Sequence, residues 1–278
     1  MPAIPIFVIN LQRDTERRRH MEQQLEGLGL KAEFITAVDG RTLSQRERAA
    51  CDRARSRRVY GREMTENEVG CYLSHHRLYE RMIRERIETA LIMEDDVRVD
   101  QNFPRILDEL LFCPFTDWLV IRLDSKRTQV VDPPSAKFAG TRVADISGAA
   151  GLYRLRTRVL GVGAYLIKHE GAVRMLAYGR RIFMPIDQTL DRYWENGILP
   201  YVVRPLPVQQ REDFGSSTGP RPFGGRRTQP LSGRLQCRVQ RISDGVRKRA
   251  FNLANRKETK VPRPHRLFWE HALSQEVR

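Results

Sequence analysis

The sequence predicts an α/β fold in which a mostly parallel sheet is flanked by helices. Short apolar runs rich in β-formers alternate with stretches of helical periodicity over the first 210 residues. Residues 4–38 follow the order strand, helix, strand with short links, which is the order of a βαβ unit. The chain has 278 residues, of which 40% are hydrophobic. That is enough for one large domain with an appendage.

The first unit begins with a buried strand over residues 4–11. Asp14 is expected to cap a helix over residues 15–28, and a second strand over residues 32–38 ends at Asp39. Ligands of open α/β sheets bind beside such strand ends. No Gly-x-Gly-x-x-Gly follows the first strand, so a dinucleotide-binding fold gains little support.

Two capping boxes of the form Ser/Thr-x-x-Glu open the next helices. The first predicts a short basic helix over residues 44–58, and the second predicts a helix over residues 65–86. The second helix carries Ser74 and His75 and leads directly into the next strand. By spacing alone these two residues either belong to a site or only pack against the core.

The next strand, Ala90 to Met93, runs into three consecutive carboxylates, Glu94-Asp95-Asp96. Like charges this close repel and raise one another's pKa, and packing does not require them. A divalent cation removes the conflict, and oxygen ligands suit Mg²⁺ or Mn²⁺. The alternative is a strand followed by an acidic turn, and the string alone does not decide between the two.

The same alternation continues toward residue 210. We expect a helix over 102–112, a strand over 118–123, a β-ribbon (129–131 with 141–146), a strand over 159–168, helices over 170–179 and 188–196, and a strand over 199–209. Asp187 precedes the last of these helices and is either its N-cap or a general base beside an acceptor hydroxyl.

Residues 1–210 are expected to form the main domain, and residues 211–278 an Arg-rich, partly flexible extension. The extension carries 16 Lys/Arg against 6 Asp/Glu, so it holds +10 of the total net charge of +15. Its beginning is rich in Gly, Ser, Pro and Arg, which favours a flexible segment. Helical spacing returns over residues 234–255. This basic amphipathic helix either lies on an anionic membrane or docks on the preceding domain.

The four cysteines form no CxxC pair and no zinc spacing, so we expect reduced thiols in the cytoplasm. No basic leader precedes the apolar start of the chain, and no apolar run reaches the roughly 20 residues that a bilayer span requires. We therefore expect a cytoplasmic protein that can lie on the inner face of the cytoplasmic membrane.

Taken together, these motifs resemble the family 25 glycosyltransferases, specifically the lipooligosaccharide β-1,4-galactosyltransferase type of Gram-negative bacteria. Four blocks carry the resemblance in the family's order, at residues 6–11, 34–40, 65–75 and 90–97. Residues 163–167, 171–172 and 185–187 also match. The order and spacing of the blocks over residues 4–190 make the resemblance specific.

The resemblance implies a GT-A fold, a nucleotide-sugar donor (most often UDP-galactose) and inversion at the anomeric carbon. It implies that Glu94, Asp95 and Asp96 stand where related enzymes have an Asp-x-Asp metal motif. Asp96 would then bind Mn²⁺ or Mg²⁺ directly, Glu94 would orient the ribose or the metal's waters, and the metal would neutralise the departing diphosphate.

The resemblance also implies a donor site and a base. The donor-binding residues would be Asn10, Leu11, Arg13, Asp39, Ser74 and His75. Asp187 becomes the candidate for the general base.

The function we expect is transfer of a hexose to a lipopolysaccharide core or a similar glycan, with the basic extension near phosphorylated glycolipid or anionic lipid. Two alternatives remain. A nucleic-acid-binding protein would use the basic extension, but the chain lacks regular aromatic interleaving, and nucleic acid is not the partner we expect. A non-catalytic scaffold would bind donor or glycan without turnover, and the retained carboxylates argue against it. The donor sugar, the third metal ligand and the oligomeric state stay open.

Overall fold

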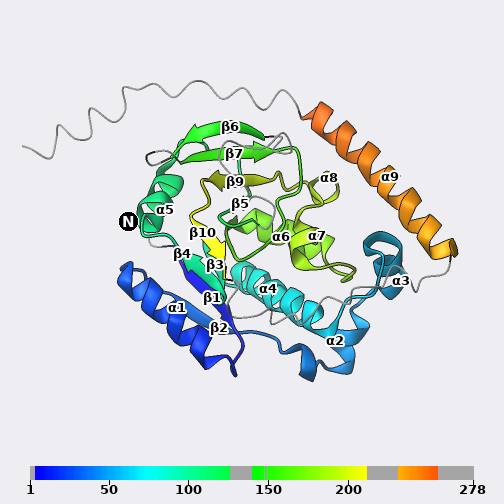
Figure 1. Cartoon of the computed structure of the whole chain (residues 1–278), viewed down its shortest axis with the longest axis horizontal. Helices are drawn as coiled ribbons and strands as arrows, with labels where there is room; N and C mark the ends of the chain where they lie inside the picture. The colour runs from blue at the N-terminus through cyan, green and yellow to red at the C-terminus, as the bar shows by residue number, and fades with distance from the viewer. Residues whose placement is uncertain (1–3, 126–139, 147, 149, 212–230, 256–278) are drawn as a thin grey trace, which may run out of the picture.

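The computed structural model describes residues 4–125, 140–146, 148, 150–211 and 231–255. The central strands are β1 (Ile6–Asn10), β2 (Glu33–Thr36), β3 (Thr89–Glu94), β5 (Val120–Arg122), β6 (Gly140–Asp145), β7 (Gly151–Leu155), β8 (Ala164–Lys168) and β9 (Tyr201–Arg204). They form one eight-stranded sheet in the order β2-β1-β3-β8-β5-β9-β7-β6 (Figure 1). The α/β class is confirmed.

The helices cover both faces of this sheet. They are α1 (Thr15–Gly27), α2 (Gln45–Ala49), α3 (Arg53–Arg55), α4 (Glu66–Arg84), α5 (Phe103–Phe112), α6 (His169–Tyr178), α7 (Ile186–Leu190), α8 (Tyr193–Asn196) and α9 (Leu231–Ala254), with a 3₁₀ turn η1 (Gly40–Thr42) and a π-helix η2 (Ser56–Tyr60). None of the helices that the structure describes is both long and apolar enough to cross a membrane.

The sheet is mixed, which refines the prediction of a mostly parallel one. Six strands point the same way, while β7 and β8 run against them. Because β8 lies between β3 and β5 and is antiparallel to both, antiparallel pairings outnumber parallel ones. A strand buried on both faces shows the same apolar run in either direction, so the sequence pattern does not reveal this reversal.

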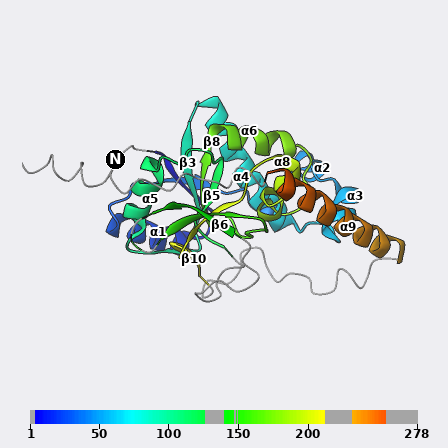
Figure 2. The ribbon, with the colours of Figure 1, turned by 90° about the horizontal axis from the view of Figure 1, so that it is seen from above.

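Two apolar layers hold the helices against the sheet. Figure 2 shows helices on both sides of the sheet. Successive strand side chains point to opposite faces. Ile6 and Val8 therefore lie in the layer under α1 and α5, while Phe7 and Ile9 lie in the layer under α4 and α6. The buried alternation fixes the register of β1, and with it the place where the strand ends.

Both predicted capping boxes are confirmed, at the N-termini of α2 and α4. Asp14 occupies the N-cap position of α1, but its side chain makes no capping hydrogen bond. The basic helix predicted over residues 44–58 is wrong as a single element, because it divides into α2, α3 and η2. The division comes at Asp52, whose side chain caps α3 while its backbone N–H donates to Ile182 O.

Two further elements were predicted as single and are divided. The strand expected over residues 199–209 becomes β9 and then β10 (Val208–Gln210), which pairs with β4 (Val97–Val99) in a separate two-stranded sheet. The helix expected over residues 188–196 becomes α7 and α8, and the break follows Asp191, whose carboxylate accepts the N–H groups of Val159 and Leu160.

The predicted β-ribbon is correct in one arm only. β6 pairs with β7, which the sequence pattern missed, and residues 129–131 lie outside the described residues. The helix expected near residue 234 is confirmed as α9.

Two glycines bring η1 and α4 into backbone contact. A Cβ on Gly70 would lie 2.5 Å from Val38 O, and one on Gly40 would lie 2.5 Å from Glu66 O. No real Cβ comes this close to backbone, so neither position accepts a side chain without moving an element.

We therefore predict that Gly70→Ala lowers the free energy of unfolding by about 1–3 kcal/mol, the cost of overpacking. Gly27→Ala is the matched control, because Gly27 lies in α1 and a Cβ there meets nothing within 4 Å. It should leave stability unchanged or raise it by up to about 1 kcal/mol, since alanine is the better helix former. Denaturant unfolding of both variants tests this. An equal loss of unfolding free energy in the two variants would contradict the close backbone contact at Gly70.

Candidate functional site

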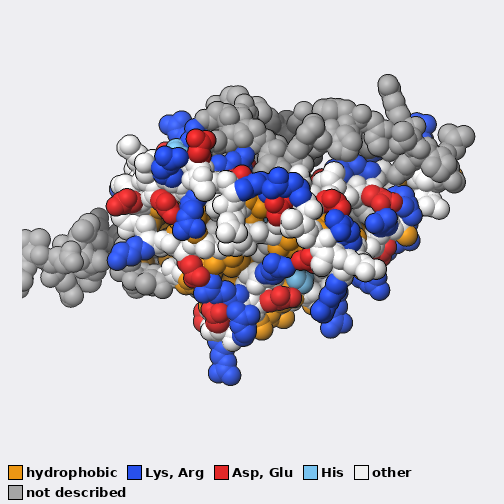
Figure 3. Space-filling view, turned by 90° about the horizontal axis from the view of Figure 1, so that it is seen from below, with side chains coloured by type: hydrophobic (Ala, Val, Ile, Leu, Met, Phe, Trp, Pro, Cys, Tyr) orange, Lys and Arg blue, Asp and Glu red, His pale blue; other side chains and the backbone are white. Residues whose placement is uncertain are grey.

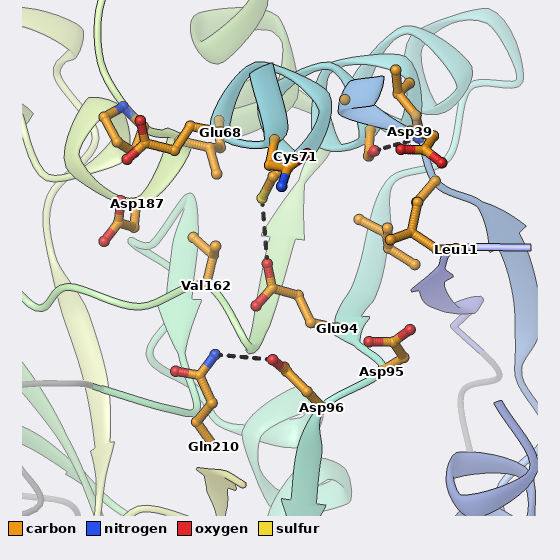
Figure 4. A pocket seen from close by; sticks show the side chains of 18 of the residues that line it. Leu11, Asp39, Glu68, Cys71, Glu94, Asp95, Asp96, Val162, Asp187 and Gln210 are labelled. Atoms are coloured by element: carbon orange, nitrogen blue, oxygen red, sulfur yellow. Dashed lines mark hydrogen bonds between the residues drawn. The ribbon is translucent and has the colours of Figure 1, made fainter. Parts of the chain in front are cut away.

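One pocket lies at the carboxyl ends of β1, β2 and β3 (Figure 4). Eight of the ten predicted site residues line it: Leu11, Arg13, Asp39, Ser74, Glu94, Asp95, Asp96 and Asp187. They come from five separate parts of the chain, and the parallel strands β1, β2 and β3 bring most of them to one edge. Asn10 and His75 lie behind the lining.

The middle carboxylate of the acidic strand end is already held by protein groups. Asp95 Oδ2 accepts a 2.7 Å hydrogen bond from Asn10 Nδ2, and Oδ1 lies 3.2 Å from Arg17 Nη1. Asn10 is buried and also donates to Asp14 O, so its side chain positions Asp95. With both oxygens engaged, Asp95 is less available to a metal than its two neighbours.

Asp96 carries the strongest electrostatic conflict in the pocket. Burial, followed by the charges of Glu94 and Asp95, raises the pKa of Asp96 to about 7. Its Oδ2 accepts a 3.4 Å hydrogen bond from Gln210 Nε2, while its buried Oδ1 has no hydrogen-bond partner among the described residues. An unpaired carboxylate oxygen beside two further carboxylates is the environment that a hard divalent cation relieves.

Glu94 extends toward α4 from the end of β3 (Figure 4). Cys71 Sγ donates to Glu94 Oε1 at 3.6 Å, and His75 Nε2 lies 3.5 Å from the same oxygen. His75 is fully buried, and its Nδ1 lies 2.7 Å from the hydroxyl of Tyr165. His75 therefore lies behind Glu94 and does not line the pocket.

The ligand atoms of Cys71, His75 and Glu94 lie within 4.8 Å of one another. This sulfur, nitrogen and oxygen set suits a softer ion such as Zn²⁺. The oxygen pair of Glu94 and Asp96 suits Mn²⁺ or Mg²⁺, and Glu94 belongs to both sets.

Another wall of the pocket is formed by the residues that follow β1 and β2. Hydrogen bonds from the Arg41 side chain, assisted by the charge of Arg13, hold the pKa of Asp39 at about 2, so this carboxylate is ionised. Ser74 Oγ accepts from Val38 N and donates to Gly70 O, each at 2.8 Å. Its hydroxyl ties the β2 end to α4.

Asp187 is not an N-cap, because α7 starts at Ile186 with Pro185 as its N-cap. The capping interpretation is therefore wrong at this position. The Asp187 carboxylate accepts from Gln188 N at 2.8 Å and, more weakly, from Gly161 N at 3.4 Å. In Figure 4, Asp187 and Glu94 lie on either side of Val162.

Sequence reasoning missed several pocket residues. Gln210 reaches Asp96 only because β10 pairs with β4, and a three-residue strand has no readable pattern. Glu68 was recognised as a capping residue, yet it also accepts from Arg62 and Tyr60 and lines the pocket. Cys71 lies one turn before His75 on α4, and this spacing was the available signal.

We predict that Asp96→Asn stabilises the metal-free protein. Because folding raises the pKa of Asp96 from 3.8 to about 7, stability falls as the pH rises above 3.8, and the full cost of the ionised form is present above about 7. The neutral amide removes a penalty of up to about 4 kcal/mol. Thermal unfolding at pH 8 in a chelator should show a higher Tm for the variant, while added Mn²⁺ should raise the Tm of wild type more than that of the variant.

Asp145→Asn, a substitution of an exposed residue on β6, is the control. It should change neither the Tm in chelator nor the rise in Tm on adding Mn²⁺. A lower Tm for Asp96→Asn in chelator would contradict the electrostatic conflict.

Comparisons with known proteins assign the chain to a family. A family model described as glycosyltransferase family 25 (LPS biosynthesis protein) matches residues 3–190. A glycosyltransferase 25 family member of Aedes aegypti is 38% identical over 204 residues, which cover 69% of this chain and 31% of that protein. Procollagen galactosyltransferase 2 of Homo sapiens is 28% identical over 222 residues, 76% of this chain and 32% of that protein.

The chain thus spans about a third of the length of these two relatives. Among solved structures, a glycosyltransferase involved in the glycosylation of the major capsid of PBCV-1 aligns with 70% of this chain and 67% of its own. It is 9% identical to this chain, with a TM-score of 0.33. The family model covers well over half of the chain, and on that ground the chain belongs to glycosyltransferase family 25.

Proposed function

We propose that the chain is a metal-dependent glycosyltransferase that moves galactose from UDP-galactose, with inversion, onto a lipooligosaccharide or lipopolysaccharide core or a related bacterial glycan. The observation that supports this proposal most strongly is that one pocket is lined by the carboxylates at the end of β3, by the residues after β1 and β2, and by Asp187. The galactosyltransferase name of the human relative and the LPS description of the family support the sugar and the acceptor.

The β1–β2 wall suits the nucleotide half of the donor. Leu11 offers an apolar contact to the base, and ionised Asp39 accepts hydrogen bonds from ribose hydroxyls. Arg13 pairs with Asp39 and lines the same wall, where its charge attracts the diphosphate. Asn10 and His75 serve this site from behind, where Asn10 holds Asp95 and His75 lies against Glu94. Ser74, in the pocket lining, ties the β2 end to α4.

The acidic end of β3 suits the metal. Glu94 and Asp96 would hold Mn²⁺ or Mg²⁺, and Asp95, engaged by Asn10 and Arg17, positions the strand end. The bound ion would supply Lewis-acid stabilisation of the departing diphosphate.

Asp187 suits the role of general base. The acceptor hydroxyl oxygen forms its bond to the anomeric carbon as the carbon–oxygen bond to UDP breaks. UDP leaves with the electron pair, and the hydroxyl proton passes to the Asp187 carboxylate. A base on the face opposite the leaving group produces inversion.

The two alternative functions, a nucleic-acid-binding protein and a non-catalytic scaffold, gain less support. On the face shown in Figure 3, basic side chains alternate with acidic ones and form no continuous basic surface of the kind that nucleic acid binds. A non-catalytic scaffold does not explain why the buried Asp96 carboxylate lies beside two other carboxylates. We extend the proposal to peripheral contact between the Arg-rich extension and anionic membrane.

We expect UDP release from one UDP-sugar, UDP-galactose, in a panel assayed with and without Mn²⁺. Release should depend on Mn²⁺ and fall at least about a hundredfold in Asp96→Asn, because the diphosphate loses its counter-charge. Asp145→Asn should match wild type. If no sugar is hydrolysed and calorimetry detects no Mn²⁺-dependent UDP binding, the proposed function is wrong.

Asp187→Asn should lower UDP release by about 10²- to 10⁴-fold, the usual contribution of a general base, while the Kd for UDP stays within about twofold of wild type. The matched control is Gln188→Ala, which alters the neighbouring residue on the same wall and should cost less than about tenfold. A weakened Kd for UDP together with unchanged release would assign Asp187 to binding.

A further inference from the structure

The helix α9 turns its polar face toward the domain. Asp244 is buried and accepts two 2.7 Å hydrogen bonds from the buried Arg192 guanidinium. Cys237, two turns earlier, is also buried, and its Sγ donates to Arg57 O at 2.9 Å. These contacts hold one side of α9 against α8 and η2 (Figure 1).

The opposite side of α9 exposes an apolar stripe, which we define as Leu235, Val239, Ile242, Val246 and Leu253. Each is between 58% and 68% exposed. Their spacing of three, four and seven residues aligns them along one side of a helix. The stripe is about 27 Å long at 1.5 Å per residue. Exposed apolar side chains aligned in this way mark an interaction site.

Basic side chains border the stripe. At 100° per residue, Arg238 and Arg249 lie directly along one edge and Arg234 just beyond them, and all three are exposed. Arg247 lies toward the other edge and pairs with Glu195. Within the described part of α9, Asp244 is the one acidic residue, and it faces the domain.

We propose that α9 lies on the surface of an anionic lipid bilayer, with the apolar stripe at the boundary between headgroups and acyl chains and the bordering arginines on lipid phosphates. A second copy of the chain fits the stripe less well. It would bring arginine-lined edges together, and the exposed side of α9 offers no carboxylate to neutralise them.

This placement would put the pocket close to a membrane. The helix packs against η2, and Tyr60 at the end of η2 lines the pocket. A lipid-linked acceptor would then meet a pocket wall that rests on the bound helix. The proposal depends on the exposure and charge of α9 and holds whether or not the transferase assignment is right.

Flotation with lipid vesicles tests the proposal on the full chain. Vesicles of phosphatidylcholine mixed with phosphatidylglycerol should carry wild type, and vesicles of phosphatidylcholine alone should not. The triple variant Leu235→Gln, Ile242→Gln, Val246→Gln should reduce partition at least about tenfold, because it removes most of the buried apolar area. The double variant Arg238→Gln, Arg249→Gln should lose about fivefold for each arginine, and raised salt should reproduce that loss.

The matched control is Phe112→Gln with Val173→Gln, which removes exposed apolar side chains from α5 and α6 and should leave partition unchanged. Thermal unfolding and UDP release of the triple variant should equal wild type, so a failed transferase assay and a failed membrane assay remain distinguishable. Three results would overturn the proposal: no flotation of wild type, unchanged flotation of the triple variant, or a dimer in light scattering that the triple substitution converts to monomer.

Discussion

The repulsion among Glu94, Asp95 and Asp96 is the constraint on which the rest of the pocket depends. Three carboxylates at the end of a buried strand are tolerated only where each has its own compensation. Asp95 is neutralised by Arg17 and held by Asn10, both from the first unit of the chain. Glu94 is supported by Cys71 and His75 of α4. Among these three carboxylates, only Asp96 has a buried oxygen without a hydrogen-bond partner in the described structure, so the conflict is greatest at that atom.

The groups that contact these three carboxylates come from segments that are far apart in the sequence. β1 supplies the amide of Asn10 and α1 supplies the guanidinium of Arg17. The thiol of Cys71 and the imidazole of His75 come from α4. β10 supplies Gln210 through its pairing with β4. The backbone contact between Gly40 and Gly70 sets how closely α4 approaches the β2 end. The carboxylates that suit a metal and the carboxylate of Asp187 thus line one cavity.

The sequence predicted the first 100 residues best, because strong hydrophobic periodicity and two complete capping boxes agree there. Eight of its ten predicted site residues line the pocket, since carboxyl ends of parallel strands share an edge. The roles of Asn10 and His75 could not be read, because a buried polar side chain behind a site has the same local pattern as one in it. The reversed direction of β8 and the short strands β4 and β10 depend on tertiary pairing, which local sequence does not encode.

The most direct test is the position of the metal in crystals of the protein grown with Mn²⁺ and UDP, located by anomalous scattering. We predict one Mn²⁺ peak between Glu94 and Asp96, with the diphosphate on the ion and the uridine beside Leu11 and Asp39. A peak enclosed by Cys71, His75 and Glu94, or UDP bound away from the β1–β2 edge, would contradict the account.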